Sequence, residues 1–166
     1  MERKITKLLS GWKSSKNRLP LVIQGARQVG KTYSVLDFGK NNFRNIVNLN
    51  FERNPDLHLI FERDLSPQRI IRELSVWSGE NIYKEDSLLF FDEIQSCNRA
   101  LTSLKYFAEE DPSYAIIAAG SLLGVTLKRE GNSFPVGNVR SVTLYPLDFE
   151  EFLWAIGLKK AVDIIH

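Results

Sequence analysis

One segment constrains the fold of this chain more than any other feature: positions 25–32 read GARQVGKT, the pattern G-x-x-x-x-G-K-T. This spacing is typical of a phosphate-binding loop between a strand and a helix. Gly25 and Gly30 let the backbone turn where a Cβ atom would clash, so successive N–H groups can face one concavity and hold phosphate oxygens. A helix beginning at Lys31 would add the positive end of its dipole. The segment therefore predicts that the chain binds the phosphates of a nucleotide.

Two side chains of this loop carry further chemistry. Lys31 brings a cation to the β- and γ-phosphates, and the hydroxyl of Thr32 is a hard oxygen ligand of the kind that Mg²⁺ prefers. Arg27 is expected to point out of the concavity. The residues expected to bind the nucleotide are consecutive: Gly25, Ala26, Arg27, Gln28, Val29, Gly30, Lys31, Thr32 and Tyr33.

The flanking sequence supplies the strand and the helix that such a loop requires. Residues 19–24 read as a short buried strand bounded by Pro20 and Gly25. Residues 33–43 carry apolar side chains at helical spacing. An ordinary glycine turn with an exposed lysine is the alternative, and the flanking pattern disfavours it.

A second candidate site lies where a predicted strand ends in two adjacent carboxylates, Asp92 and Glu93. The strand, residues 87–91, ends in consecutive apolar residues, which suits a parallel sheet covered on both faces. Ligands of such sheets lie beyond the carboxyl ends of the strands. Asp92 therefore fits the Walker B role of holding Mg²⁺, directly or through water, and Glu93 can accept a proton from an attacking water or orient it. A solvated acidic strand end is the alternative.

A third candidate is Ser121, which follows Gly120 at the end of an apolar strand predicted over residues 114–119. If this strand lies beside the strand of the phosphate-binding loop, the hydroxyl of Ser121 could sense the γ-phosphate or help to place the attacking water. A plain strand-to-loop turn is the alternative, because Gly and Ser are common in turns.

Helix and strand patterns alternate along the rest of the chain, as a parallel α/β fold requires. The remaining predicted elements are strands over residues 45–51 and 139–144 and helices over residues 66–77, 100–110 and 148–156. Ser66 and Pro67 suit a helix start, and Asp148 with Glu151 predicts a capping box. Residues 128–137 read as a mobile loop.

The order of these motifs distinguishes the ATPase division of phosphate-binding-loop folds from the kinase–GTPase division. A strand lies between the loop strand and the Walker B strand, and a glutamate follows Asp92. This favours the ATPase division, with a parallel five-stranded sheet in the order 5-1-4-3-2 flanked by helices. The chain has no N-K-x-D motif for guanine specificity. A small-molecule kinase, the remaining alternative, would need an arginine-bearing lid, for which Arg129 is the candidate.

Composition and length indicate one globular domain. The chain has 166 residues, of which 43% are hydrophobic and 25% charged. Cys97 is the only cysteine, so no internal disulfide can form. The longest purely apolar run, residues 115–119, is far shorter than the ~18 residues that cross a membrane, and no secretory signal follows Met1. We therefore expect a cytoplasmic protein without a membrane partner.

Positive charge is concentrated at the N-terminus, although the net charge of the chain is only +2. Residues 1–18 contain one acid, Glu2, and these basic residues: Arg3, Lys4, Lys7, Lys13, Lys16 and Arg18. Apolar residues recur there at helical spacing: Ile5, Leu8, Leu9 and Trp12. We expect an amphipathic helix that docks its apolar stripe on the sheet and keeps its lysines in water. Contact of its basic face with DNA or RNA phosphates, or with a membrane surface, is the alternative.

Five strings, in their order and spacing, resemble a large group of prokaryotic AAA-type ATPases: GARQVGKT, LLFFDEIQ, AAGSLLG, FPVGNV and LYPLDFEEFL. The resemblance covers about residues 19–157 and implies an ATP-binding core, with Walker A at residues 25–32, Walker B at Asp92 and Glu93, and a sensor at Ser121. Members are usually described only as ATP-binding proteins. They commonly carry a winged-helix segment and a restriction-nuclease-like domain of unknown function after the ATPase domain.

Two departures from the group stand out. Asn138 lies where similar sequences often have Lys or Arg, which puts a cation role there in doubt, and the downstream domains are absent. The chain also ends within an apolar helical pattern. We therefore expect three parts: a basic amphipathic N-terminal helix over residues 1–18, a P-loop ATPase core over residues 19–157, and the start of a truncated C-terminal region over residues 158–166.

The predicted function is Mg²⁺-dependent hydrolysis of ATP to ADP and phosphate, which drives a conformational change in attached or partner domains. The residues with predicted roles are Lys31, Glu93 and Ser121 for catalysis, and Thr32 and Asp92 for Mg²⁺. Turnover should be slow in the isolated domain, because an arginine finger, often supplied in trans, can add about 10³–10⁵ in rate. The finger candidates are Arg140, Arg129 and Arg99.

Two other functions stay open. One is a nucleotide-dependent switch with negligible hydrolysis that recruits a partner. The other is a nucleic-acid-associated regulatory ATPase, in which the basic N-terminal helix is the binding element. The expected partners are ATP, the missing C-terminal domain and further copies of the chain, and adenine specificity follows from the resemblance alone.

Overall fold

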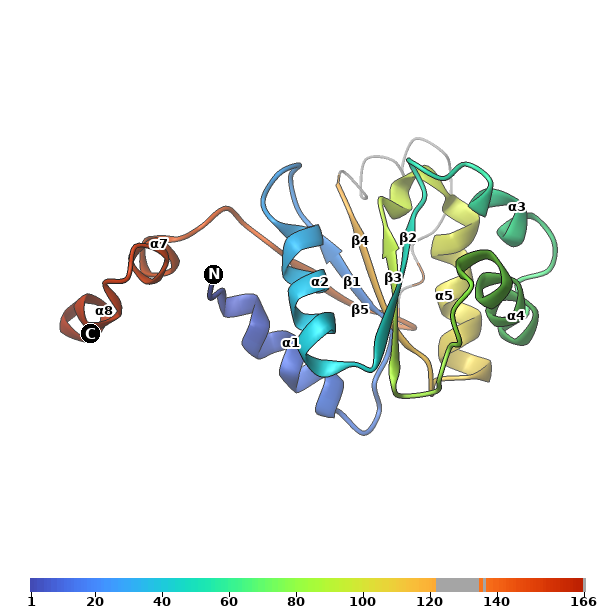
Figure 1. Ribbon diagram of the computed structural model, residues 1–166, viewed down its shortest axis with the longest axis horizontal. Helices are drawn as coiled ribbons and strands as arrows, with labels where there is room; N and C mark the ends of the chain where they lie inside the picture. Colours follow the sequence, from blue (N-terminus) through green and yellow to red (C-terminus); the bar gives the residue numbers. More distant parts are fainter. Residues whose placement is uncertain (122–134, 136, 166) are drawn as a thin grey trace.

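The computed structural model describes residues 1–121, 135 and 137–165, which form a sheet between two layers of helices (Figure 1). The described strands are β1 (Leu21–Gln24), β2 (Asn45–Asn50), β3 (Ser87–Asp92), β4 (Ala115–Gly120) and β5 (Arg140–Thr143). All of their pairings are parallel, and the order across the sheet is β2-β3-β4-β1-β5. This confirms the predicted order, so the chain has the α/β fold of the ATPase division of P-loop proteins.

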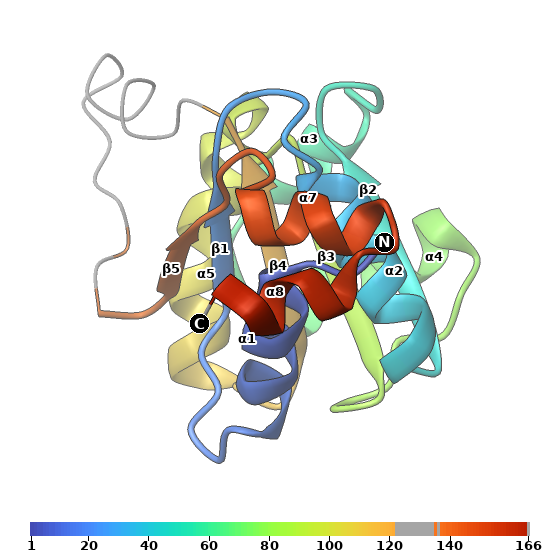
Figure 2. The same cartoon turned by 90° about the vertical axis from the view of Figure 1, so that its left-hand side faces the viewer.

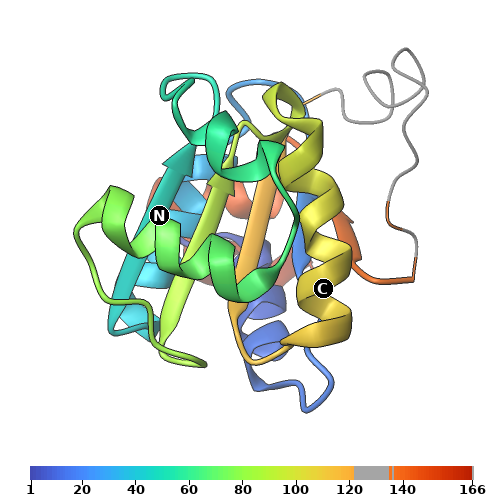
Figure 3. The same ribbon diagram turned by 90° about the vertical axis from the view of Figure 1, so that its right-hand side faces the viewer.

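Each face of the sheet has its own set of helices. One face is covered by α1 (Lys4–Ser14) and α2 (Lys31–Asn42), and the other by α3 (Leu57–Glu62), α4 (Pro67–Ser78) and α5 (Asn98–Glu110) (Figures 1 and 3). A short 3-10 turn, η1 (Ile94–Ser96), follows β3. The last two helices, α7 (Phe149–Ala155) and α8 (Lys159–Ile165), project away from the sheet near the start of α1 (Figures 1 and 2).

The interior strand β3 is buried on both faces, as its apolar run predicts. Successive side chains of a strand point to opposite faces of the sheet. Leu88 and Phe90 accordingly pack in the cluster beneath α1 and α2, whereas Leu89 and Phe91 pack in the cluster beneath α3, α4 and α5. The strand that ends at Asp92 is therefore fixed by packing from both sides.

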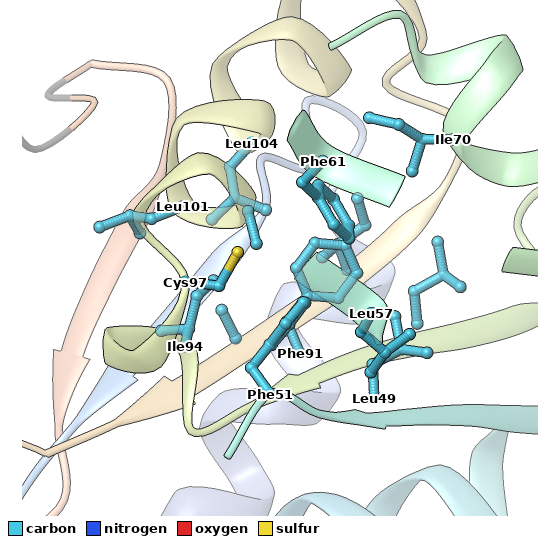
Figure 4. Packing of buried hydrophobic residues seen from close by; sticks show 14 of the residues in the cluster. Leu49, Phe51, Leu57, Phe61, Ile70, Phe91, Ile94, Cys97, Leu101 and Leu104 are labelled. Carbon is cyan, nitrogen blue, oxygen red and sulfur yellow. The ribbon is translucent and has the colours of Figure 1, made fainter. Parts of the chain in front are cut away.

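Three aromatic rings fill the core beneath α3 (Figure 4). Phe51, Phe61 and Phe91 meet edge to face in all three pairs, with ring centroids 5.5 to 5.8 Å apart. Such pairs add about 0.5–1.5 kcal/mol each beyond the area that they bury. Cys97 lies in the same cluster, and burial raises the pKa of its thiol. The cluster anchors the residues that follow β2 and β3 at one end of the sheet.

The N-terminal helix α1 docks on the sheet through its apolar stripe, as predicted. Its residues Ile5, Leu9 and Trp12 are buried in the same cluster as Leu21 and Ile23 of β1. Among the residues that the structure describes, no helix is long and apolar enough to cross a membrane.

Arg3, just before α1, departs from the expectation of a solvated basic face. Its guanidinium is buried and hydrogen-bonds to three protein groups, so it does not belong to that face. Its partners lie far away in the sequence, and the charge pattern of residues 1–18 carries no sign of them.

The structure agrees with some of the other local predictions and differs from others. Ser66 is the N-cap residue of α4, but its side chain makes no capping hydrogen bond. The predicted capping box of Asp148 and Glu151 is present at the start of α7. Helix α3 was not predicted, because its six residues are too few to show a helical period. The loop predicted over residues 128–137 falls outside the described residues except at positions 135 and 137.

Candidate nucleotide-binding site

The phosphate-binding loop lies between β1 and α2, and its two glycines are needed for different reasons. A Cβ atom at Gly25 would lie 2.4 Å from the carbonyl oxygen of Leu144, so the backbone of one of the two segments would have to shift. Gly30 has φ +96°, a left-handed conformation that other residues rarely adopt, and it is the N-cap of α2. Gln28 is also left-handed, with φ 64°. The loop therefore has the turning backbone that the sequence pattern predicts.

Lys31 is buried, and its side chain folds back against the start of the phosphate-binding loop. Its ammonium group donates to the carbonyl oxygens of Gly25, at 2.8 Å, and Ala26, at 2.6 Å. Burial lowers the pKa of Lys31, while the carboxylates of Glu93 and Asp92 act in the opposite direction. The cation thus lies among the loop carbonyls, within the electrostatic influence of both acids.

Thr32 and Asp92 meet, although they come from α2 and β3. The hydroxyl of Thr32 donates to a carboxylate oxygen of Asp92 at 2.9 Å. Asp92 is only 4% exposed, and burial raises its pKa, against the hydrogen bonds from Thr32 and from the backbone N–H of Glu93. The structure therefore brings together the two residues that the sequence assigns to Mg²⁺, and their role stays a prediction.

The donor set at this point fits Mg²⁺. A hydroxyl and a carboxylate oxygen are hard ligands, and Mg²⁺ is usually held by one or two protein oxygens together with waters and substrate phosphates. Within the described part of the chain, no group of three or more His, Cys, Asp or Glu side chains gathers into a closed metal site. Thr32 and Asp92 would therefore hold the ion together with a bound triphosphate.

Glu93 separates from Asp92 because the strand ends between them. Its backbone is left-handed, with φ 53° and ψ 45°, so the two carboxylates do not simply alternate across a continuing strand. One carboxylate oxygen of Glu93 accepts a hydrogen bond of 2.6 Å from the side-chain amide of Gln95. The amide oxygen of Gln95 is buried without a hydrogen-bond partner. The sequence pattern did not single out Gln95, although its place two residues after Glu93 in LLFFDEIQ is a signal for it.

Two adjoining grooves surround these residues. The first, of about 450 Å³, is lined by Arg27, Gln28, Gly30, Lys31, Thr32, Tyr33, Glu52 and Glu93. The second, of about 750 Å³, is lined by Thr32, Leu36, Asn48, Asn50, Glu52, Arg53, Asn54, Asp92 and Glu93. They share Thr32, Glu52 and Glu93, so they form one continuous depression over the ends of β2 and β3. The volume of each groove is in the range of ordinary ligand sites.

Polar residues after β2 belong to this depression, and the sequence reasoning missed them. The side-chain oxygen of Asn50 accepts from the backbone N–H groups of Glu52 and Arg53, which turns the chain at the strand end. Because β2 pairs with β3, with Asn50 opposite Asp92, these residues reach the same edge of the sheet as the two acids. Their signal was the polar run that follows a predicted strand.

Ser121 and Tyr33, two further predicted site residues, differ in burial. β4 pairs with β1, and its Gly120 lies opposite Gln24, so Ser121 follows the strand beside the loop strand, as predicted. Ser121 is buried, whereas Tyr33 is 53% exposed on α2 and lines the first groove.

The two arginine-finger candidates that the structure describes, Arg140 and Arg99, line neither of the two grooves. Arg140 lies at the amino end of β5, opposite Leu21, and thus at the far end of the sheet from the loop. The guanidinium of Arg99 donates to the backbone carbonyls of Phe61, at 3.0 Å, and Arg63, at 2.6 Å. Arg129 falls outside the described residues.

A protein-family model described as an AAA domain matches residues 17–153 of the chain. No curated protein sequence matches the chain. Among solved structures, C. elegans PCH-2 is similar, with 13% identity and a TM-score of 0.45 over 93% of this chain and 47% of that chain. AMPPCP-bound DnaA from Aquifex aeolicus is similar at 16% identity and a TM-score of 0.46, over 98% of this chain and 53% of that one. RuvB from Thermotoga maritima is similar at 19% identity and a TM-score of 0.46, over 98% and 49%. The chain spans about half the length of these proteins.

Proposed function

The chain belongs to the AAA domain family, and from this premise we propose that it binds ATP with Mg²⁺ and hydrolyses it to ADP and phosphate. One observation carries the proposal: the hydroxyl of Thr32 meets the buried carboxylate of Asp92 beside the loop that holds Lys31. The hydroxyl and the carboxylate suit Mg²⁺, and the ammonium group suits anionic phosphates, so the three groups together fit a magnesium–triphosphate.

The loop and Lys31 would bind the phosphates. Backbone N–H groups at the start of α2 point out of the helix end, where the dipole favours an anion. Lys31 would exchange its loop carbonyl partners for the β- and γ-phosphate oxygens, a small movement of one long side chain. Thr32 and Asp92 would hold Mg²⁺, which would supply positive charge against the charge that develops on the phosphates.

Glu93 would orient the attacking water. It lies just past the end of β3, lines both grooves, and is turned away from the strand direction by its left-handed backbone. The hydrogen bond from Gln95 restricts its carboxylate to one orientation. Ser121, at the end of the strand next to β1, would sense the γ-phosphate.

Nucleotide binding is tested by titrating Mg²⁺-ADP into the wild-type protein and the Lys31→Ala variant. We expect saturable binding by wild type and at least about a hundred-fold weaker binding by the variant, because a charge-assisted contact from the buried Lys31 to a phosphate is lost. Lys40→Ala, an exposed lysine on the same helix, is the control and should bind as wild type does. Equal ADP affinity for Lys31→Ala and wild type would refute the site.

A nucleotide-dependent switch with negligible hydrolysis is the second candidate, and one observation favours it. The Glu93 carboxylate is already engaged by Gln95 at 2.6 Å, and a carboxylate kept in this hydrogen bond is a poorer partner for water. Under this alternative, slow turnover would not fall further in Glu93→Gln. In either case we propose that the nucleotide acts on attached domains or on further copies of the chain.

A further inference from the structure

Arg3 is a charged residue that is almost completely buried, at 5% exposure. Its Nη1 donates to the carbonyl oxygen of Val29 at 3.1 Å, its Nη2 to the carbonyl oxygen of Tyr145 at 2.9 Å, and its Nε to the carboxylate of Glu151 at 3.1 Å. One guanidinium therefore joins the phosphate-binding loop, the segment after β5, and α7. Taking such a charge out of water is costly unless it is paired and hydrogen-bonded, as it is here.

At the loop, Arg3 acts on a peptide group next to the proposed phosphate site. In a trans peptide the C=O and the following N–H point in opposite directions. The bond from Arg3 to the Val29 carbonyl therefore directs the N–H of Gly30 to the other side of the peptide. A Cβ atom at Gly30 would lie 3.3 Å from Nη1 of Arg3, which shows how closely the guanidinium approaches the loop.

At α7, the partner of Arg3 is half of the capping box. The carboxylate of Glu151 also accepts from the backbone N–H groups of Lys4, at 2.9 Å, and Asp148, at 3.1 Å. The carboxylate of Asp148 accepts from the N–H of Glu151 in return. The start of α1 and the start of α7 are thus joined through one buried carboxylate.

Helix α7 has few apolar contacts that could hold it in place instead. Leu153 is buried beside Glu151, whereas Phe149, Phe152 and Ile156 are about half exposed or more. Figure 2 shows α7 lying across the N-terminal end of the chain, outside the helical layers of the sheet. Its placement therefore depends strongly on the charged contacts at its first turn.

We propose that Arg3 is a positioning residue that holds the Val29–Gly30 peptide for phosphate binding and couples nucleotide occupancy to the placement of α7. The inference rests on the proposed nucleotide site. A nucleotide that tightens the loop stabilises the Arg3 contacts, and these restrain the start of α7. By linkage, any change that fixes α7 in this position raises nucleotide affinity by the same factor.

The test compares Arg3→Ala, Arg3→Lys and Glu151→Gln with wild type. Mg²⁺-ADP affinity is measured by titration, and hydrogen exchange of residues 148–155 is followed with and without ADP. We expect Arg3→Ala to bind ADP on the order of ten-fold more weakly, since coupling between sites is commonly 5- to 150-fold. Arg3→Lys keeps the charge but lacks the planar fork, so it should recover part of the affinity.

Glu151→Gln weakens only the α7 end of the contact. The Val29 carbonyl keeps Arg3, so ADP affinity should fall by less than in Arg3→Ala, and by the same factor by which ADP loses its stabilisation of α7. Lys7→Ala, at an exposed lysine of α1, is the control and should leave ADP affinity unchanged.

Several outcomes would overturn the inference. If Arg3→Ala binds ADP as wild type does while Lys31→Ala does not bind, the nucleotide site stands and the role of Arg3 is wrong. If wild type binds no ADP, both proposals fail. If Arg3→Ala does not fold, hydrogen exchange of the wild type alone decides: ADP that protects residues 25–32 without protecting residues 148–155 contradicts the coupling.

Discussion

The two sides of the candidate site are held by different kinds of contact. On one side, Asp92 follows a strand packed through both faces, with Phe90 in one core cluster and Phe91 in the other. On the other side, the Val29 side chain packs in the cluster beneath α1 and α2, but its carbonyl oxygen is held by the guanidinium of Arg3. Close-packed apolar cores yield little, whereas a charged network depends on every one of its members. The side that would hold the metal is rigid, and the loop side is the one that another element can influence.

The same contrast separates the core from the end of the chain. Phe51, Phe61 and Phe91 form a closed set of edge-to-face contacts beneath α3 (Figure 4). Phe149 and Phe152 of α7 are 65% and 48% exposed. Similar side chains thus stabilise the fold in one place and contribute little in the other.

The largest effect should come from Phe91→Ala. It removes a fully buried ring from the aromatic cluster, so we expect a loss of about 3–5 kcal/mol in the free energy of unfolding, measured by urea denaturation. Phe152→Ala on α7 is the matched control and should change stability by less than about 1 kcal/mol. Equal losses in the two variants would remove the distinction between the core and the end of the chain.

A smaller effect should come from Gly25→Ala at the loop. The new Cβ atom would lie 2.4 Å from the Leu144 carbonyl oxygen, so overpacking should cost about 1–3 kcal/mol and weaken ADP binding. Gly11→Ala is the control, because nothing lies within 4 Å of a Cβ atom there. Placed inside α1, it should raise stability by up to about 1 kcal/mol. A stable, ADP-binding Gly25→Ala would show that the loop does not need this close approach.

The smallest effect, of opposite sign, should come from Asp92→Asn. Burial raises the pKa of Asp92, so the folded protein binds this proton more tightly than the unfolded chain does. Stability therefore falls as the pH rises through the ordinary pKa of aspartate and on through the raised value. Asp92→Asn removes this loss and should be more stable at pH 7, by less than about 2 kcal/mol, while Mg²⁺-dependent nucleotide binding is weakened.

The pH dependence provides the check on this variant. The stability gain should shrink as the pH is lowered towards about 4, where the wild-type carboxyl becomes protonated in the unfolded chain as well. Urea denaturation of both proteins across this range measures the gain. An Asp92→Asn protein that is less stable than wild type at pH 7 would show that the carboxylate stabilises the fold.

The sequence predicted what depends on local spacing. The loop over residues 25–32 and the acids after β3 are short patterns, and the alternation of strands and helices limits the sheet to few orders. The order and the parallel pairing were therefore predicted correctly. The placement of Ser121 after the strand beside β1 followed from that order. The roles of Lys31, Glu93 and Ser121 stay predictions.

What depends on contacts between distant segments was not predicted. Arg3 and Glu151 are 148 residues apart, and the charge pattern of the N-terminus alone suggested an exposed residue. Glu52 reaches the site only because β2 pairs with β3. Gln95 reaches Glu93 because η1 turns the chain back directly after the strand. In each case the contact depends on the tertiary fold, which cannot be inferred from a short pattern in the sequence.

The most direct test of the central claim is ADP production from Mg²⁺-ATP by wild type and Glu93→Gln under identical conditions. A residue that orients the attacking water is worth about 10²–10⁴ in rate. The account predicts slow turnover by wild type, a drop of at least about a hundred-fold in the variant, and equal ADP affinity in both. Turnover that Glu93→Gln leaves unchanged would contradict the proposed role of Glu93 as the residue that orients water.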